Sequence, residues 1–182
     1  NDFRLTEAAV FQNMPFVYGL PELNKLAIQS AQYIANPGCF ATAIQLAILP
    51  LAANSLIKDA IHVNAVTGAT GAGTALSPTT HFAWRVDNFS HYKAFNHQHL
   101  GEIHQSVNSL QQDLQSVIHF IPNRGNFSRG IFATIYTAYE GTLETAISLF
   151  KNHYKEAEFT FISDTSIHLK QVVNTNKCLL HL

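Results

Sequence analysis

Residues 34–43 read Ile-Ala-Asn-Pro-Gly-Cys-Phe-Ala-Thr-Ala, and the rest of the chain is organised around them. The Pro-Gly pair predicts a turn. Apolar residues then recur at helical spacing, at Phe40, Ile44, Ala47 and Leu51. A helix is therefore predicted from about Cys39 to Leu51. This places the Cys39 sulfur at a helix N-terminus, where free amides and the helix dipole favour an anion. We expect the pKa of this thiol to be lowered, and the thiolate is the nucleophilic form.

A second interpretation of Cys39 is a small buried hydrophobic side chain without a chemical role. The chain contains two cysteines, Cys39 and Cys178. They form neither a disulfide framework nor a Cys-x-x-Cys metal motif. Two unpaired thiols are typical of a reducing compartment, so we expect a cytoplasmic protein.

The composition favours one folded domain and disfavours a nucleic-acid or membrane surface. The chain has 182 residues, of which 47% are hydrophobic, enough to bury a core. Only 13% are charged and the net charge is −1, so no basic surface for nucleic acid or an anionic membrane is expected. No apolar run approaches the ~20 residues of a membrane span. The chain begins without Met and ends in an apolar run, and we expect both ends to have been cut from a longer protein.

Periodicity along the chain predicts an α+β domain, with a mixed β-sheet and helices on one face. Helices are predicted over residues 22–31, 39–51, 101–114 and 142–154. Strands are predicted over residues 61–66, 117–121, 131–139, 159–162 and 170–173. The strand over 131–139 is apolar on both faces, so we expect it to be central in the sheet. A turn is expected over residues 122–128.

A glycine-rich loop, Thr-Gly-Ala-Thr-Gly-Ala-Gly-Thr-Ala at residues 67–75, follows the first predicted strand. Its G-x-x-G-x-G spacing reverses the order of a dinucleotide-binding loop, and Ser77-Pro78 prevents a helix from following, which argues against a Rossmann unit. The small residues would let backbone N–H groups approach a phosphate or carboxylate. Gly68, Gly71 and Gly73 are therefore candidate anion-binding residues, and a plain surface turn is the alternative.

His97 and His99 form a His-x-His pair directly before a predicted helix. One interpretation is a binding site for a first-row transition metal. Its third ligand would come from His81, His91 or Glu102. No H-E-x-x-H motif accompanies the pair, so we do not expect a metal. The other interpretation is that the fold brings one histidine to Cys39, where it acts as general base and then as general acid.

Six stretches, in this order along the chain, resemble motifs of the N-acetyl-γ-glutamyl-phosphate reductase family of arginine biosynthesis. Residues 36–43 resemble its active-site segment NPGCYPTA. Residues 67–73 resemble its S-G-x-S-G-A-G loop, and residues 97–103 resemble its H-R-H-T-P-E-I motif. The other matches are Asp2-Phe3-Arg4-Leu5, Tyr18-Gly19-Leu20-Pro21-Glu22 and Arg129-Gly130-Ile131. The family is related to aspartate-semialdehyde dehydrogenase, which uses the same chemistry.

This resemblance implies the catalytic and dimerisation domain of a two-domain enzyme, similar in fold to the C-terminal domain of glyceraldehyde-3-phosphate dehydrogenase. In the family an N-terminal Rossmann domain binds NADPH, and that domain is absent from this sequence. Residues 1–182 are then expected to be a single catalytic domain truncated at both ends, inactive in hydride transfer by itself. The implied partners are an acyl phosphate substrate and further copies of the chain, as a dimer or tetramer, without nucleic acid or membrane.

The resemblance also implies a mechanism. The Cys39 thiolate attacks N-acetyl-γ-glutamyl phosphate and expels phosphate, and NADPH reduces the resulting thioester to N-acetylglutamate semialdehyde. We choose His97 as the acid–base residue, with His99 as the second candidate and Glu102 orienting an imidazole. The expected substrate-binding or anion-binding residues are Asn36, Gly38, Gly68, Gly71, Gly73 and Arg129. The alternative functions are a Cys–His thiol hydrolase or acyltransferase and a metal-binding structural module.

The chain departs from the family pattern at three motifs. Phe40-Ala41 stands in place of Tyr-Pro, which is a mild change. Thr74 replaces the basic residue that usually follows the glycine loop, and Gln98 replaces the arginine between the histidines. The last two changes remove positive charges that would help to bind an anionic substrate. The sequence leaves N-acetyl and N-succinyl substrates both open.

Overall fold

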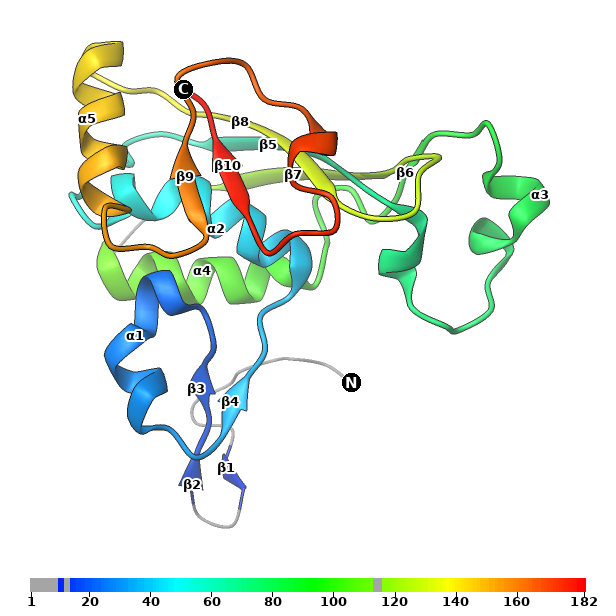
Figure 1. The fold of residues 1–182 in the computed structure, drawn as a ribbon, viewed down its shortest axis with the longest axis horizontal. Helices are drawn as coiled ribbons and strands as arrows, with labels where there is room; N and C mark the ends of the chain where they lie inside the picture. The colour runs from blue at the N-terminus through cyan, green and yellow to red at the C-terminus, as the bar shows by residue number, and fades with distance from the viewer. Residues whose placement is uncertain (1–9, 12–13, 113–115) are drawn as a thin grey trace.

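A computed structural model describes residues 10–11, 14–112 and 116–182, and its centre is a four-stranded mixed sheet (Figure 1). The strand order is β6 (Ser90–His91), β7 (Ile118–Arg124), β5 (Ile61–Thr67) and β8 (Ile131–Tyr136). Strand β5 pairs in parallel with β7 and antiparallel with β8. The parallel pair ends at the same edge, where Thr67 lies opposite Arg124.

Two helices, α2 (Cys39–Ala52) and α4 (His99–Leu110), lie together on one side of this sheet (Figure 1). A third helix, α5 (Leu143–His153), begins at a capping box in which Thr142 accepts from the Thr145 amide. The core is formed by apolar side chains of α2, α4, β5 and β7, among them Phe40, Ile44, Leu49, Val63, Ile103, Val107 and Phe120. Burying each such side chain contributes about 1.5–3 kcal/mol. The predicted α+β class, with helices on one face of a mixed sheet, is confirmed.

Smaller elements surround this core. Helix α1 (Pro21–Ser30) and the parallel pair of β3 (Val17–Tyr18) and β4 (Ile34–Ala35) precede α2. An arm that extends from the edge of the sheet carries η1 (Ala69–Ala72), η2 (Pro78–Thr80) and α3 (Phe82–Arg85) (Figure 1). The hairpin β1 (Val10–Phe11) and β2 (Met14–Pro15) and the parallel pair β9 (Thr160–Ile162) and β10 (Cys178–Leu180) complete the described elements. None of the helices in the described residues is long and apolar enough to cross a membrane.

The structure corrects several predicted elements. Strand β8 lies at an edge of the sheet instead of its centre. Its apolar composition does not mean that both faces are covered, because Phe132, Thr134 and Tyr136 on one face are exposed. Residues 122–124 continue β7 instead of forming a turn, since β5 pairs with all three and β6 pairs with Asn123 and Arg124. Residues 170–173 form no strand: η3 (Leu169–Gln171) is a 3₁₀ turn there, and β10 is the strand that pairs with β9. Helix α4 begins two residues earlier than expected, at His99. Motif residues 2–5 and Leu114 lie outside the described residues.

Candidate active site

The thiol of Cys39 lies where the sequence predicts it, at the first residue of α2. Gly38 is the N-cap, with extended backbone angles, and its carbonyl accepts the first helical hydrogen bond from the Thr42 amide at 2.8 Å. The Cys39 side chain is exposed. The thiol is therefore both accessible and next to the positive end of the α2 dipole.

The direction of the Cys39 pKa shift is opposite to the prediction. Neighbouring protein atoms displace water from the sulfur and raise the pKa of the thiol, even though much of the side chain remains exposed. The negative charge of Glu102 raises this pKa further. Hydrogen bonds from the amides of Phe40 and Cys39 lower the pKa but do not compensate. A helix N-terminus alone does not make this cysteine a thiolate.

Glu102 connects the helix that carries the thiol to the helix that carries the histidines. Its carboxylate is buried, with 5% of the residue exposed. One oxygen, Oε2, accepts from the Gly38 amide at 2.9 Å and from the Tyr18 hydroxyl at 3.0 Å. Tyr18 in turn accepts from the Gln45 side-chain amide at 2.7 Å. Glu102 therefore fixes Gly38, the residue immediately before Cys39.

His99 is the histidine that lies closest to this carboxylate. Its Nε2 is 3.9 Å from Oε1 of Glu102. Its ring lies directly against Gly38, where a Cβ atom would be only 2.4 Å from Nε2. Glycine is therefore required before Cys39 so that the imidazole can approach. Burial lowers the pKa of His99, and the charge of Glu102 opposes this shift.

His97 occupies a more enclosed position. It is 5% exposed, and its ring meets the rings of Phe40 and Phe120 edge-on. Its Nδ1 accepts from the His99 amide at 3.2 Å. Burial lowers the pKa of His97 to about 4, and the positive charges of His99 and Lys93 add to the shift. Among the described residues, no hydrogen bond joins either imidazole to the Cys39 sulfur.

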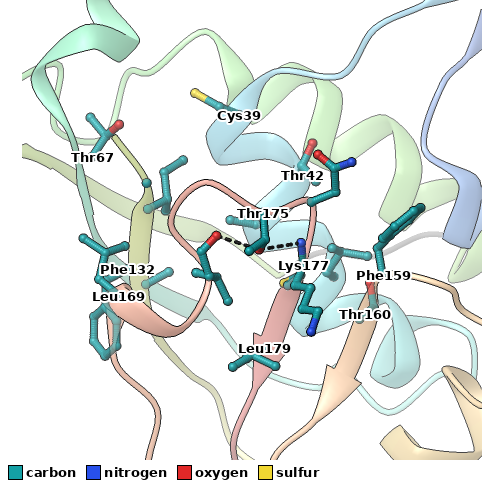
Figure 2. Close-up of a pocket in the computed structure, with 18 of the residues that line it drawn as sticks. Cys39, Thr42, Thr67, Phe132, Phe159, Thr160, Leu169, Thr175, Lys177 and Leu179 are labelled. Carbon is teal, nitrogen blue, oxygen red and sulfur yellow. Dashed lines mark hydrogen bonds between the residues drawn. The ribbon is translucent and has the colours of Figure 1, made fainter. Parts of the chain in front are cut away.

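A cavity of about 1000 Å³ extends from Cys39 between α2, β8 and the segment 167–180 (Figure 2). Figure 2 shows Cys39 and Thr67 towards one end of it, and Thr175 and Lys177 on the C-terminal segment. Five of the expected site residues line this cavity: Asn36, Cys39, Gly68, Gly71 and Arg129. His97, His99 and Glu102 do not line it.

The glycine loop uses its amides within the chain. The amides of Gly68, Gly71 and Gly73 donate to the carbonyl groups of Gly130, Gly68 and Thr70. A Cβ at Gly68 would lie 2.4 Å from the Ser128 carbonyl oxygen, so this glycine permits close packing of two loops. None of the three amides is free to bind an anion in this structure. The Gly38 amide is likewise occupied by Glu102.

Asn36 and Arg129 are both exposed at the cavity. The Asn36 side chain donates to the Pro37 carbonyl at 3.2 Å. Arg129 makes no side-chain hydrogen bond and no ion pair with the residues that the structure describes. Its side chain is available to a ligand.

Sequence reasoning missed three residues near the site: Tyr18, Tyr92 and Arg124. Tyr18 lies within the resembling stretch at residues 18–22, but its partner Glu102 is 84 residues away. The Tyr92 ring is 5.7 Å from the His97 ring, and Arg124 lies over it. No local spacing signals these contacts.

The metal-binding alternative has no ligand set in the described part of the chain. No group of three His, Cys, Asp or Glu residues gathers there in a way that could hold a metal ion. The candidate third ligands do not assemble a site with the His97–His99 pair. This pair is instead occupied by its contacts with Phe40, Gly38 and Glu102.

Similar proteins are named N-acetyl-gamma-glutamyl-phosphate reductase, which is the family that the sequence motifs resemble. An N-acetyl-gamma-glutamyl-phosphate reductase of Christiangramia forsetii is 66% identical over 167 residues, 92% of this chain and 52% of that protein. The one of Flavobacterium johnsoniae is 57% identical over 182 residues, 100% of this chain and 56% of that protein. The chain thus spans about half the length of the curated relatives it matches.

Solved structures share the fold at much lower identity. An aspartate semialdehyde dehydrogenase II from Vibrio cholerae matches with a TM-score of 0.65 and 13% identity, over 91% of this chain and 57% of that one. A probable aspartate-semialdehyde dehydrogenase from Pseudomonas aeruginosa matches with a TM-score of 0.62 and 10% identity, over 95% and 59%. Residues 39–182 match the family described as semialdehyde dehydrogenase, dimerisation domain. The chain therefore belongs to the semialdehyde dehydrogenase dimerisation-domain family.

Proposed function

We propose that this chain is the catalytic domain of an NADPH-dependent reductase that converts N-acetyl-γ-glutamyl phosphate to N-acetylglutamate semialdehyde and phosphate. The observation that carries the proposal is the exposed Cys39 thiol at the start of α2, next to a glycine that contacts both His99 and Glu102. The names of the most similar relatives support the choice of substrate.

In the proposed reaction the Cys39 sulfur attacks the acyl carbon, the bond to the phosphate oxygen breaks, and phosphate leaves with that bonding pair. A histidine must take the thiol proton because the pKa of Cys39 is raised. His99 is better placed than His97, since it lies against Gly38 and the charge of Glu102 favours its protonated form. NADPH, when bound, supplies the hydride that reduces the thioester.

We assign NADP binding mainly to a domain outside this chain. The amides of Gly68, Gly71 and Gly73 all donate hydrogen bonds within the chain, so these glycines offer no unpaired N–H groups to bind a pyrophosphate. The chain alone is then not expected to transfer hydride. Homo-oligomerisation and a cytoplasmic location complete the proposal, and the family description as a dimerisation domain supports the first of these.

Acyl transfer to Cys39 tests this function without the nucleotide domain. The chain is incubated with acetyl phosphate or N-acetyl-γ-glutamyl phosphate, and the acylated cysteine is located by peptide mass spectrometry. We expect a hydroxylamine-sensitive thioester at Cys39 and none at Cys178, whose pKa is raised to about 11 by burial. His99→Ala should slow acylation more than His97→Ala if His99 is the base.

Two results would contradict the proposal. Equal acylation of the two cysteines would show that Cys39 has no special reactivity. Rapid hydrolysis of the Cys39 thioester, with continuous release of the carboxylate, would favour the thiol hydrolase alternative, because a reductase must preserve the thioester until hydride arrives.

A further inference from the structure

A chain of two hydrogen bonds leads from α2 to the carboxylate of Glu102. The side-chain amide of Gln45 donates from Nε2 to the Tyr18 hydroxyl at 2.7 Å, and this hydroxyl donates to Oε2 of Glu102 at 3.0 Å. Gln45 is completely buried, and Glu102 is 5% exposed. Burial is the largest cause of a raised pKa at Tyr18, so the hydroxyl keeps its proton near neutral pH and acts as a donor.

The orientation of the Gln45 amide decides where the Tyr18 proton points. An amide nitrogen only donates, so the tyrosine oxygen accepts from it, and the hydroxyl proton is left for the carboxylate of Glu102. The reversed amide would place two acceptor groups around a single hydroxyl proton. The observed orientation leaves Oε1 of Gln45 buried without a hydrogen-bond partner among the described residues. Such an unpaired acceptor is uncommon and calls for a reason, and directing the Tyr18 proton to Glu102 supplies one.

Two donors on one oxygen fix the rotation of the Glu102 carboxylate. Oε2 accepts from the Tyr18 hydroxyl at 3.0 Å and from the Gly38 amide at 2.9 Å. The other oxygen, Oε1, lies 3.9 Å from Nε2 of His99. With the Gly38 amide as its only donor, the carboxylate could turn about its last bond. The Tyr18 hydroxyl opposes this rotation, so Oε1 stays on the side of the imidazole.

The elements that carry Tyr18 and Gln45 are held by contacts other than these hydrogen bonds. Strand β3 pairs in parallel with β4, with Tyr18 opposite Ala35. The Tyr18 carbonyl accepts from the Asn24 side chain at 2.9 Å. Gln45 lies on α2, the helix that begins at Cys39. A side chain on a fixed strand or helix orients a functional group more precisely than one on a loop.

Tyr18 and Gln45 lie outside the cavity of the candidate site. Neither residue lines the cavity that Cys39 lines, so neither is placed to contact a substrate there. Their connection to the thiol is Glu102, which accepts from the amide of the residue before Cys39. The charge of Glu102 also raises the pKa of Cys39.

We propose that Tyr18 and Gln45 are positioning residues for acyl transfer to the thiol at the start of α2. They hold Glu102 in the orientation in which one carboxylate oxygen binds Gly38 and the other faces His99. The proposal rests on the acyl phosphate chemistry proposed above, and it adds two residues that the substrate does not touch.

The titration of His99 reports the position of the Glu102 charge. Burial lowers the pKa of His99, the charge of Glu102 opposes this shift, and the charge of Lys93 adds to it. The ring of His97 is a further titratable group against His99, with the ring centres 4.6 Å apart. If the carboxylate of Glu102 turns away, the pKa of His99 should fall further. This pKa is measured by NMR of the chain with isotope-labelled histidine, and the signal is assigned by its loss in His99→Gln.

Tyr18→Phe removes the donor to Glu102 and retains the ring. We expect it to lower the pKa of His99 and to slow acylation of Cys39 by acetyl phosphate about tenfold, the scale of a lost hydrogen bond to a charged group. Gln45→Met, which removes the amide, should change both in the same direction by less, because the Tyr18 hydroxyl can still reach Glu102. In the Glu102→Gln background, Tyr18→Phe should leave the pKa of His99 unchanged, since no charge remains to be moved.

Tyr154→Phe is the matched control for a purely structural role. Tyr154 is 5% exposed, and its hydroxyl donates at 2.6 Å to the carbonyl of Leu46, the residue after Gln45 on α2. Loss of this hydroxyl should destabilise the chain but leave the pKa of His99 and the acylation rate unchanged. Circular dichroism and thermal melting establish that each variant is folded. If Tyr18→Phe is not folded, Gln45→Met decides the test.

The positioning role is overturned if Tyr18→Phe leaves the pKa of His99 or the acylation rate unchanged. It is also overturned if the shift of this pKa is as large in the Glu102→Gln background, or if Tyr154→Phe produces the same shift. These outcomes are distinct from failure of the proposed function. If acetyl phosphate does not acylate Cys39 in the unchanged chain but Tyr18→Phe lowers the pKa of His99, the positioning of Glu102 stands and the reductase proposal fails. If acylation occurs and this pKa does not respond, only the positioning role fails.

Discussion

The amide of Gly38 donates a 2.9 Å hydrogen bond to the carboxylate of Glu102, a residue 64 positions later in the chain. This bond fixes the start of α2, where Cys39 lies, relative to α4, where His99 lies. The same carboxylate raises the pKa of the Cys39 thiol and opposes the lowering of the His99 pKa. One buried charge therefore influences both partners of the proposed proton transfer.

Glu102→Gln separates the charge of this residue from its shape. Glutamine retains an oxygen that can accept from the Gly38 amide and the Tyr18 hydroxyl, but it carries no charge. We expect the pKa of Cys39 to fall, because the charge that raises it is removed. The midpoint of Cys39 alkylation against pH, followed by mass spectrometry, should move to lower pH. A midpoint that stays the same or moves to higher pH would contradict this expectation. Glu144→Gln, which changes a fully exposed carboxylate, is the control.

Tyr18→Phe removes a hydroxyl that has two buried partners. Gln45 donates to this hydroxyl, which itself donates to Glu102. Leaving buried polar groups short of a partner costs about 1–3 kcal/mol. For a chain of this size we expect the melting temperature to fall by at least about 2 °C. Tyr136→Phe is the matched control, because that residue is 63% exposed and its hydroxyl makes no hydrogen bond in the described residues. Equal melting temperatures of the two variants would refute the prediction.

Gly38→Ala tests whether glycine is needed for the approach of His99. The added methyl group would lie within 2.7 Å of three atoms of the His99 ring, so the imidazole must move. We expect acylation of Cys39 by acetyl phosphate to slow by about a hundredfold, the scale of a 1 Å misplacement. Gly101→Ala is the control because nothing lies within 4 Å of its added methyl, and in α4 it should stabilise the chain by about 0.5–1 kcal/mol. Similar acylation rates for both variants would show that the contact is unimportant.

Patterns within about ten residues were sufficient to predict the elements that position Cys39. The Pro-Gly turn and the apolar spacing after it correctly place the start of α2 at Cys39. The alternation over residues 61–66 correctly places β5. Thr142 correctly marks the start of α5, because capping is a local hydrogen bond.

Contacts between distant residues could not be predicted in this way. The edge position of β8 depends on which strands pair with it, and this choice leaves no mark within the strand. The Tyr18–Glu102 and Arg124–Tyr92 contacts join residues that only the fold brings together. The Cys39 pKa was predicted in the wrong direction for the same reason, since burial by the surrounding residues, with the charge of Glu102, outweighs the effect of the helix terminus.

The buried imidazole of His97 should make stability depend on pH. Burial lowers its pKa to about 4 in the folded chain, whereas an unfolded histidine has a pKa of about 6.5. Above pH 6.5 both states are neutral at this residue, so its contribution to stability is fully present. As the pH falls from 6.5 to 4, the unfolded state binds the proton first, and stability decreases by up to about 3 kcal/mol. Urea unfolding at pH 7 and pH 5 measures the loss.

The His97→Gln variant isolates this effect from that of the other histidines. Burial also lowers the pKa of His99, His104 and His153, so the unchanged chain should lose stability through several residues. Glutamine can occupy much of the same space but does not titrate. The difference in unfolding free energy between the chain and the variant should therefore shrink from pH 7 to pH 5. A difference that is independent of pH would mean that His97 is protonated as readily in the folded chain as in the unfolded one.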